Sequence, residues 1–179
     1  MTQDVWLIAG IPGVGKTTTA RALTARLPKS AHIEGDTVND FIISYSTPRD
    51  EEAAIGESER MRLNRRNQCV LARSFAENGF VPVIDYVVFT RKQVDEYLGH
   101  LKSLSLHLIS LMPGPAAVLE RDKARPNIVK SAAADWIHLD PIMREELKGM
   151  GLWIDNATLS VDATVDHILA NQDKALVRA

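Results

Sequence analysis

The feature that most constrains this chain is a glycine-rich octapeptide near the N-terminus, Gly10-Ile-Pro-Gly-Val-Gly-Lys-Thr17. An apolar run, Val5–Ala9, precedes it, and a helical pattern over Thr17–Leu27 follows and ends at Pro28. The octapeptide matches G-x-x-x-x-G-K-[ST] in full, a pattern in which a strand turns through a loop into a helix. The sequence therefore predicts a phosphate-binding loop between the first strand and the first helix.

The loop combines backbone donors with two side chains that suit a nucleotide. Its glycines allow the backbone to approach a polyphosphate, so that several N–H groups point at phosphate oxygens. We expect Lys16 to contact the β- and γ-phosphates and the hydroxyl of Thr17 to hold Mg²⁺. The residues that we predict to bind ATP in this loop are Gly10, Gly13, Val14, Gly15, Lys16, Thr17 and Thr18.

The rest of the chain alternates short apolar runs with longer amphipathic segments. Further strands are predicted at Ala31–Ile33, Val81–Val88, Leu104–Met112 and Leu152–Ile154. Further helices are predicted at Val38–Tyr45, Glu57–Asn78 (closed by Gly79), Arg91–Leu101, Ala116–Arg125, Ala132–Lys148 (with a break near Pro141) and Val161–Asn171. This alternation is typical of an α/β fold with a parallel sheet covered on both faces. The pattern leaves the strand order open.

Composition narrows the class of protein further. The chain has 179 residues, 45% of them apolar, and a formal net charge of −2. We expect one domain over residues 1–179 that binds neither nucleic acid nor membrane, as a monomer or homodimer. A lone cysteine, Cys69, excludes an intrachain disulfide. The N-terminus lacks the basic start of a signal peptide, so a cytoplasmic location is expected.

Two acidic residues follow predicted strands, where ligands bind in open α/β sheets. Asp36 follows the second strand and is our candidate for the general base that deprotonates an acceptor hydroxyl, with simple helix capping as the alternative. Asp85 comes directly after Val81–Ile84 of the third strand and is a candidate for the Mg²⁺ site and for acceptor contact, and a turn residue is the alternative. Tyr86 is added as a substrate-binding candidate.

Arginines provide candidate anion-binding groups. Arg121 and Arg125 are four residues apart, so on a movable helix they could close over the phosphates and stabilise the transferring group. A second cluster, Arg60, Arg62, Arg65 and Arg66, lies on the long helix, where Arg62, Arg65 and Arg66 share one side. For both clusters the alternative is a solvated charged face. Arg62 is the one that we predict to bind substrate.

Two further interpretations concern the remaining polar residues. Asn156, after the last strand, is predicted to approach an adenine ring, with a plain turn as the alternative. The histidines have no metal-ligand spacing, and we expect each of them to be structural or exposed. These are His32, His100, His107, His138 and His167.

With these residues in this order, the chain resembles the small P-loop kinases, and in particular the chloramphenicol phosphotransferase-like group, over residues 4 to 172. The resemblance implies a P-loop NTPase three-layer sandwich with a five-stranded parallel sheet in the order 2-3-1-4-5 and a short helical lid. It also implies that Lys16 binds ATP, that Asp36 is the base, and that Asp85 is the strand-end acid. Arg121 and Arg125 match the lid arginines. The tail Trp153–Ala170 also resembles tunicamycin-resistance-type P-loop proteins.

The predicted function is an ATP- and Mg²⁺-dependent O-phosphotransferase that acts on a small hydroxylated molecule, with antibiotics among the candidate acceptors. Residues 37–80 would bind the acceptor and residues 121–140 would form the lid. The polar, arginine-rich segment 46–66 argues against an apolar aromatic acceptor. Two alternatives are a nucleoside monophosphate kinase, whose D-G-F-P-R segment is missing, and a nucleotide-switched binding protein without transfer. Missing N-K-x-D and L-S-G-G-Q segments argue against GTPases and transporters, and the chain is short for an AAA-type motor.

Overall fold

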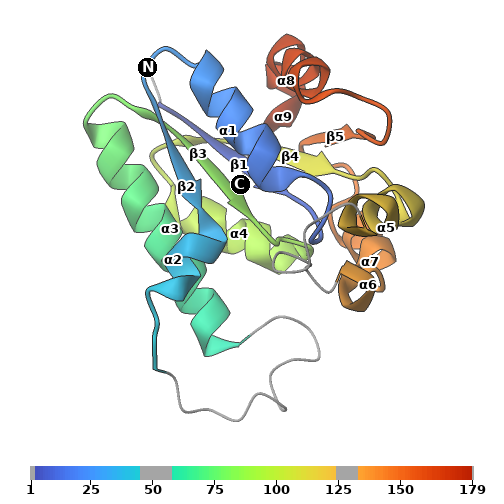
Figure 1. The fold of residues 1–179 in the computed structure, drawn as a ribbon. Helices are drawn as coiled ribbons and strands as arrows, with labels where there is room; N and C mark the ends of the chain where they lie inside the picture. Colours follow the sequence, from blue (N-terminus) through green and yellow to red (C-terminus); the bar gives the residue numbers. More distant parts are fainter. Residues whose placement is uncertain (1–2, 45–57, 124–132, 179) are drawn as a thin grey trace.

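The computed structural model describes residues 3–44, 58–123 and 133–178. Five parallel strands form the central sheet, and their order is β2-β3-β1-β4-β5 (Figure 1). This order confirms the one that the resemblance implies. The strands are β1 (Asp4–Ala9), β2 (Ser30–Glu34), β3 (Val81–Tyr86), β4 (Ser105–Leu111) and β5 (Leu152–Ile154).

A sixth strand, β6 (Leu176–Val177), was not predicted. It pairs antiparallel with β4, where Leu106 lies opposite Val177. With only two residues, β6 carries no period that a sequence pattern could reveal. The prediction of five strands is therefore corrected to five parallel strands and one short antiparallel strand.

Helices cover the sheet on both faces. α1 (Lys16–Arg26) and α8 (Val161–Ala170) pack together on one face, and α3 (Glu59–Glu77) and α4 (Arg91–His100) pack together on the other (Figure 1). α9 (Gln172–Ala175) lies against β4 and β5. The remaining helices lie beyond the carboxyl ends of the strands and are α2 (Gly35–Asp40), α5 (Pro115–Lys123), α6 (Ala133–Trp136) and α7 (Leu139–Glu146).

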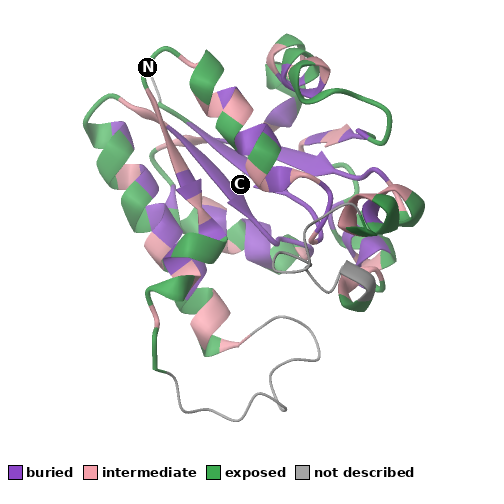
Figure 2. Ribbon diagram, in the orientation of Figure 1, coloured by how far each residue is buried: buried purple, intermediate pink, exposed green. Residues whose placement is uncertain are grey.

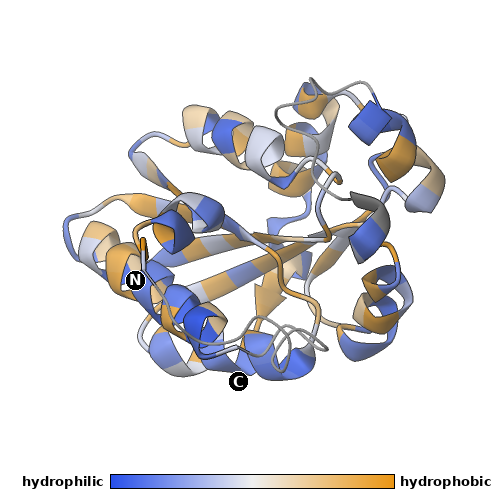
Figure 3. Cartoon of the chain, turned by 60° about the horizontal axis from the view of Figure 1, so that its bottom comes forward, coloured by the Kyte–Doolittle hydropathy of each residue, from blue (hydrophilic) through white to orange (hydrophobic). Residues whose placement is uncertain are grey.

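The core lies on both sides of the central strands. Val5, Leu7 and Ile8 of β1 are fully buried, as the unbroken apolar run predicts for a strand covered on two faces (Figure 2). In Figure 3 the strands are mainly hydrophobic, and the helices are hydrophobic on one side and hydrophilic on the other. Burial of these apolar side chains provides the main driving force for folding.

Two helix predictions are corrected. α2 begins at Gly35 rather than Val38, so Asp36 lies in the first turn and Glu34 occupies the N-cap position. The capping alternative for Asp36 is therefore wrong. The helical segment predicted over residues 132–148, with a break near Pro141, forms α6 and α7, and its break lies before Leu139. Pro141 lies in the first turn of α7, where its missing N–H has no intrahelical partner to lose.

Other helix ends follow the expected chemistry. α3 begins after Ser58, whose hydroxyl accepts a hydrogen bond from the Met61 N–H at 3.2 Å. Gly79 follows α3 in the left-handed region at φ 77°, as predicted for a glycine after a helix end. Predictions for Tyr45, for the loop 46–52 and for Arg125 fall outside the described residues. Within the described residues, none of the helices has the length and apolar character required to cross a bilayer.

Candidate functional site

The phosphate-binding loop connects β1 to α1 at the carboxyl edge of the sheet. Gly13 and Gly15 have φ angles of 92° and 97°, which side chains rarely adopt. At Gly10, an added Cβ would lie 2.6 Å from Cγ2 of Val14. The loop therefore requires glycine at these three positions to adopt its backbone conformation.

The loop ends at a helix terminus that is open to an anion. α1 begins after Gly15, and no side chain of the described part of the chain caps its first turn, which also contains no acidic residue. Its N–H groups and the positive end of the helix dipole thus remain available to a phosphate. Lys16 is buried, and its Nζ donates to the Ile11 carbonyl at 3.1 Å, so the ammonium lies over the loop. This arrangement fits a polyphosphate.

A buried carboxylate lies directly beside the loop. Thr17 Oγ1 donates to Oδ2 of Asp85 at 2.7 Å, and His32 Nε2 lies 2.6 Å from Oδ1 of the same carboxylate. Asp85 is only 3% exposed, so both of its oxygens need partners. In the sheet, Asp85 of β3 lies opposite Ile8 of β1. Strands β2 and β3 and the start of α1 thereby bring three side chains that are distant in sequence into contact.

The prediction that His32 is structural or exposed did not anticipate this contact. In β2, His32 lies two residues before Glu34, which is opposite Asp85 in the parallel register. Since alternate residues of a strand point to the same face, His32 reaches Asp85 diagonally. Only the pairing of β2 with β3 reveals this, and a single sequence does not contain that pairing.

The donor atoms around Thr17 fit a magnesium ion carried by a nucleotide. Hydroxyl and carboxylate oxygens are ligands that Mg²⁺ prefers, and the Thr17 proton is directed to Asp85, which leaves the oxygen lone pairs for a cation. Across residues 3–44, 58–123 and 133–178, no group of three or more His, Cys, Asp or Glu residues could hold a metal ion.

Asp36 lies in the first turn of α2, which directly follows β2. The residue is exposed, yet the protein on one side desolvates its carboxyl group, and this is the main reason that its pKa rises above the ordinary value of 3.8. The positive charge of Lys16 acts against this rise, and the negative charge of Asp85 adds to it. Asp36 is therefore within electrostatic reach of both the P-loop lysine and the strand-end acid.

A buried polar network holds the start of α2. Asn64 Nδ2 of α3 donates to the Gly35 carbonyl at 2.9 Å. The Tyr86 ring packs so tightly on Gly35 that an added Cβ would lie 2.4 Å from Cδ2 of the ring. Burial is the main reason that the pKa of Tyr86 rises, and the nearby Asn64 side chain acts against this rise. Tyr86 thus packs against the start of α2, with 5% of its surface exposed, rather than lying on an open surface.

The arginines of α3 are divided between two environments. Arg65 is fully buried, and its NH2 group lies 2.7 Å from Oε2 of Glu96 in α4, whereas Arg62 and Arg66 are exposed. Of the three arginines that the helical spacing places on one side, Arg65 therefore faces inward, and only Arg62 and Arg66 are open to solvent. Arg60 donates to the Asn39 side chain at 3.0 Å and connects α3 with α2.

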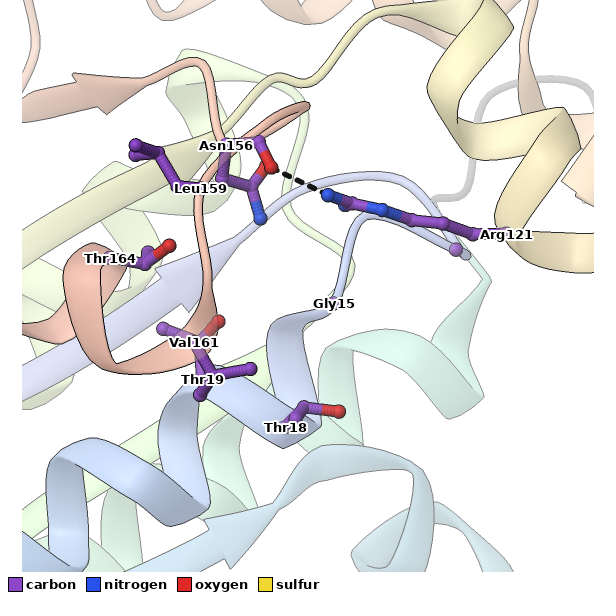
Figure 4. A pocket seen from close by; sticks show the side chains of 9 residues that line it. Gly15, Thr18, Thr19, Arg121, Asn156, Leu159, Val161 and Thr164 are labelled. Atoms are coloured by element: carbon purple, nitrogen blue, oxygen red, sulfur yellow. Dashed lines mark hydrogen bonds between the residues drawn. The ribbon is translucent and has the colours of Figure 1, made fainter.

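A cavity of about 220 Å³ lies beside the first turn of α1 (Figure 4). Arg121 of α5 lines it and donates through NH1 to the Val14 carbonyl at 3.0 Å and through NH2 to the Asn156 carbonyl at 2.5 Å. Asn156 is buried, and its Nδ2 also donates to the Val14 carbonyl at 3.0 Å. The structure thus brings Arg121 and Asn156 together beside Gly15 and Thr18, two of the predicted nucleotide-binding residues. Arg125 lies outside the described residues.

The site can be compared with known proteins. A family model described as AAA domain, AAA_18, matches residues 7–133. No curated protein sequence matches the chain. The short chain argues against an AAA-type motor, which has an additional helical domain. The family match nevertheless shows that a chain of this length can contain the P-loop domain of an AAA family.

Several solved structures are similar over nearly the whole chain. The tunicamycin resistance protein of Deinococcus radiodurans is 22% identical, with 99% of each chain covered and a TM-score of 0.68. A sugar kinase from Janibacter sp. HTCC2649 is 16% identical, with 97% of this chain and 96% of that chain covered and a TM-score of 0.69. A gluconokinase from Sinorhizobium meliloti 1021 is 16% identical, with 96% of this chain and 93% of that chain covered and a TM-score of 0.68.

At these identities the structural likeness shows the fold alone. The family match covers most of the chain and includes the phosphate-binding loop, the Asp36 turn and the Asp85 strand end. The chain therefore belongs to the AAA_18 family and has the fold of the small P-loop kinases.

Proposed function

We propose that this protein is a phosphotransferase that moves the γ-phosphate of ATP, with Mg²⁺, to a hydroxyl group of a small molecule. The observation that carries the proposal is the contact at 2.7 Å between Thr17 Oγ1 and Asp85 Oδ2, with Asp36 within electrostatic reach of Lys16 at the same sheet edge. Phosphoryl transfer needs a cradle for the donor and a group that orients the nucleophile. One edge of this sheet offers both.

On the donor side, the loop and the first turn of α1 would hold the phosphates, and Lys16 would neutralise charge on the transferring group. Thr17 and Asp85 would hold the metal ion, Thr17 through its hydroxyl oxygen and Asp85 through its contact with that hydroxyl. Mg²⁺–ATP, when bound, supplies the phosphoryl group and the positive charge of the metal ion. The residues of the chain then have to orient these groups and exclude water.

The cavity beside α1 would receive the nucleotide base. Arg121 donates to three carbonyl groups at this cavity, those of Val14, Asn156 and Ala157, so its planar guanidinium has a defined position there. Asn156 binds the Val14 carbonyl and thereby connects the wall of the cavity to the phosphate loop. A second role for Arg121, in which it stabilises the transferring group together with Arg125, would require Arg121 to release these carbonyl groups.

On the acceptor side, Asp36 would take the proton of the acceptor hydroxyl as its oxygen attacks the γ-phosphorus. Desolvation raises the pKa of Asp36, which makes it a stronger base than an aspartate with the ordinary pKa. Arg62 is exposed on α3 and, within the acceptor region of residues 37–80, would contact polar groups of the acceptor. Tyr86 would act from beneath α2, through its packing against Gly35.

The similar structures define acceptor classes for a first assay. They carry the names of a sugar kinase, a gluconokinase and a tunicamycin resistance protein. The purified protein would be incubated with Mg²⁺, γ-labelled ATP and gluconate, other sugars, nucleoside antibiotics, chloramphenicol or nucleoside monophosphates. A labelled phosphoester identifies the acceptor, and a product only with nucleoside monophosphates would replace the proposal by its first alternative.

Two matched variants test whether the labelled product is formed at the proposed site. Asp36→Asn removes the base, whereas Asp40→Asn removes the same charge from the other end of α2. We expect product with the wild-type protein and with Asp40→Asn, and none above background with Asp36→Asn. Ligand binding that requires ATP, without a labelled product from any acceptor, would instead support a nucleotide-switched binding protein.

A further inference from the structure

Two histidine–aspartate pairs connect neighbouring parallel strands, at opposite ends of the sheet. His32 and Asp85 join β2 to β3 at the carboxyl edge, where the phosphate loop lies. His107 and Asp4 join β4 to β1 near the amino edge, with Nε2 of His107 3.0 Å from Oδ1 of Asp4. The second pair touches none of the proposed nucleotide-binding residues. The same histidine–aspartate contact can therefore be compared beside the phosphate loop and at a position away from it.

The Asp85 carboxylate has a different partner at each oxygen. An ionised carboxylate only accepts hydrogen bonds, so the contact at 2.6 Å requires that His32 carries its proton on Nε2 and donates to Oδ1. Oδ2 accepts from the Thr17 hydroxyl at 2.7 Å. Without the imidazole, the carboxylate could rotate about its terminal bond, and Oδ2 would lose its fixed position towards Thr17.

We infer that His32 is a positioning residue for the divalent cation of a bound nucleotide. It donates from Nε2 to Asp85 and fixes the carboxylate, so that Oδ2 of Asp85 accepts the hydrogen bond from Thr17. The lone pairs of Thr17 Oγ1 then stay available to the metal ion. This inference rests on the proposed function, because it assigns a role within the same site. Hydrogen-bond partners of metal ligands orient those ligands, and their removal weakens metal binding by about 10- to 100-fold.

The position of His32 in the fold supports a role in orientation rather than in core packing. β2 is an edge strand of the sheet, and the side chain of His32 is 16% exposed. His107, in contrast, is in an interior strand, stacks on Trp6 with ring centroids 4.6 Å apart, and also contacts the Gln172 carbonyl through Nδ1. Loss of His107 should therefore affect stability more than loss of His32 does.

The test compares cation binding in three variants. His32→Gln keeps an amide N–H near the position of Nε2, His32→Leu removes the donor, and His107→Leu removes the matched histidine at the other edge. Mn²⁺ is titrated into each protein saturated with a non-hydrolysable ATP analogue, and bound Mn²⁺ is measured by electron paramagnetic resonance. Affinity for the analogue without metal and the melting temperature are measured in parallel.

We expect His32→Leu to weaken Mn²⁺ binding by about 10- to 100-fold, with metal-free nucleotide affinity unchanged and His32→Gln close to the wild type. His107→Leu should lower the melting temperature and keep the wild-type Mn²⁺ affinity. In the transfer assay, the Mg²⁺ concentration for half-maximal rate should rise for His32→Leu, while KM for the acceptor stays the same.

Three results would overturn the inference. Wild-type Mn²⁺ affinity in His32→Leu would show that Asp85 needs no help from His32. An equal loss in His107→Leu would mean that general destabilisation causes the effect. If His32→Leu does not fold, His32→Asn replaces it, since its amide is too short to reach Oδ1, and equal affinities for the Asn and Gln variants would contradict the inference. Absence of Mn²⁺–nucleotide binding in the wild type would instead remove the proposed function itself.

Discussion

The two sides of the proposed site are built in different ways. On the nucleotide side, the loop from Gly10 to Thr17 is one continuous segment whose glycines and lysine are read directly from the sequence. On the acceptor side, Asp36, Asn64 and Tyr86 come from three elements, and Asn64 holds the turn that carries Asp36 through the Gly35 carbonyl. The nucleotide side therefore depends on local backbone geometry, whereas the acceptor side depends on tertiary packing. Substitutions should separate these two dependences.

On the nucleotide side, the largest effect is expected for Lys16→Ala. Lys16 lies over the loop with its ammonium bonded to the Ile11 carbonyl, so its loss removes the positive charge nearest to the phosphates. We expect transfer to fall by about 10²–10³-fold, with weaker ATP binding. Calorimetric titration with an ATP analogue and the label assay measure both quantities. Unchanged transfer would contradict the assignment of the loop.

A smaller effect is expected for Gly35→Ala, which disturbs the acceptor side through packing alone. The new Cβ would lie 2.4 Å from the Tyr86 ring and 2.8 Å from Nε2 of Gln68, so α2 or the ring must shift. We expect a loss of about 1–3 kcal/mol in the free energy of unfolding. We also expect a higher KM for the acceptor with unchanged ATP affinity. Denaturant titration and kinetics check the prediction, and Gly99→Ala, where an added Cβ meets nothing within 4 Å, is the control.

The smallest expected effects concern pH. Desolvation raises the pKa of Asp36, so the carboxyl group holds its proton more tightly in the folded than in the unfolded protein. Its contribution to stability is therefore complete below about pH 3.8 and is lost as the pH rises through the raised pKa. Asp36→Asn, which stays neutral, should not lower the melting temperature at pH 7 and should raise it slightly.

The same shift predicts the acid limb of the pH–rate profile. A base must be ionised to accept the hydroxyl proton, so kcat should fall with decreasing pH around a midpoint above 3.8. Steady-state rates between pH 4 and 8 would locate this midpoint. A rate that is constant down to the ordinary value for aspartate would contradict the role of Asp36 as base.

The sequence predicts the nucleotide side better than the acceptor side for a physical reason. The loop motif, the helix that follows it and Asp85 at a strand end are local features, and the structure has each of them at the predicted place. The contact of His32 with Asp85 depends on strand pairing, and the inward turn of Arg65 depends on Glu96 in another helix. Such contacts between elements are set by tertiary packing, which no local pattern contains.

The strand order is a second feature that local sequence patterns did not predict. The alternation of apolar runs indicated a parallel sheet, but the order β2-β3-β1-β4-β5 came from a family resemblance and was confirmed by the structure. The pairing of β6 with β4 was missed, because two residues are too few for a periodic signal. The start of α2 at Gly35 was also missed, although Asp36 in its first turn suits the positive end of the helix.

The most direct test of the central claim measures ATP affinity and phosphoryl transfer side by side in Asp36→Asn and Lys16→Ala. We predict that Asp36→Asn lowers kcat by about 10²–10⁴-fold while its ATP affinity stays at the wild-type value. Lys16→Ala should change both quantities. Wild-type transfer in Asp36→Asn, or a parallel loss of ATP binding and transfer in that variant, would contradict the separation of the site into a nucleotide side and an acceptor side.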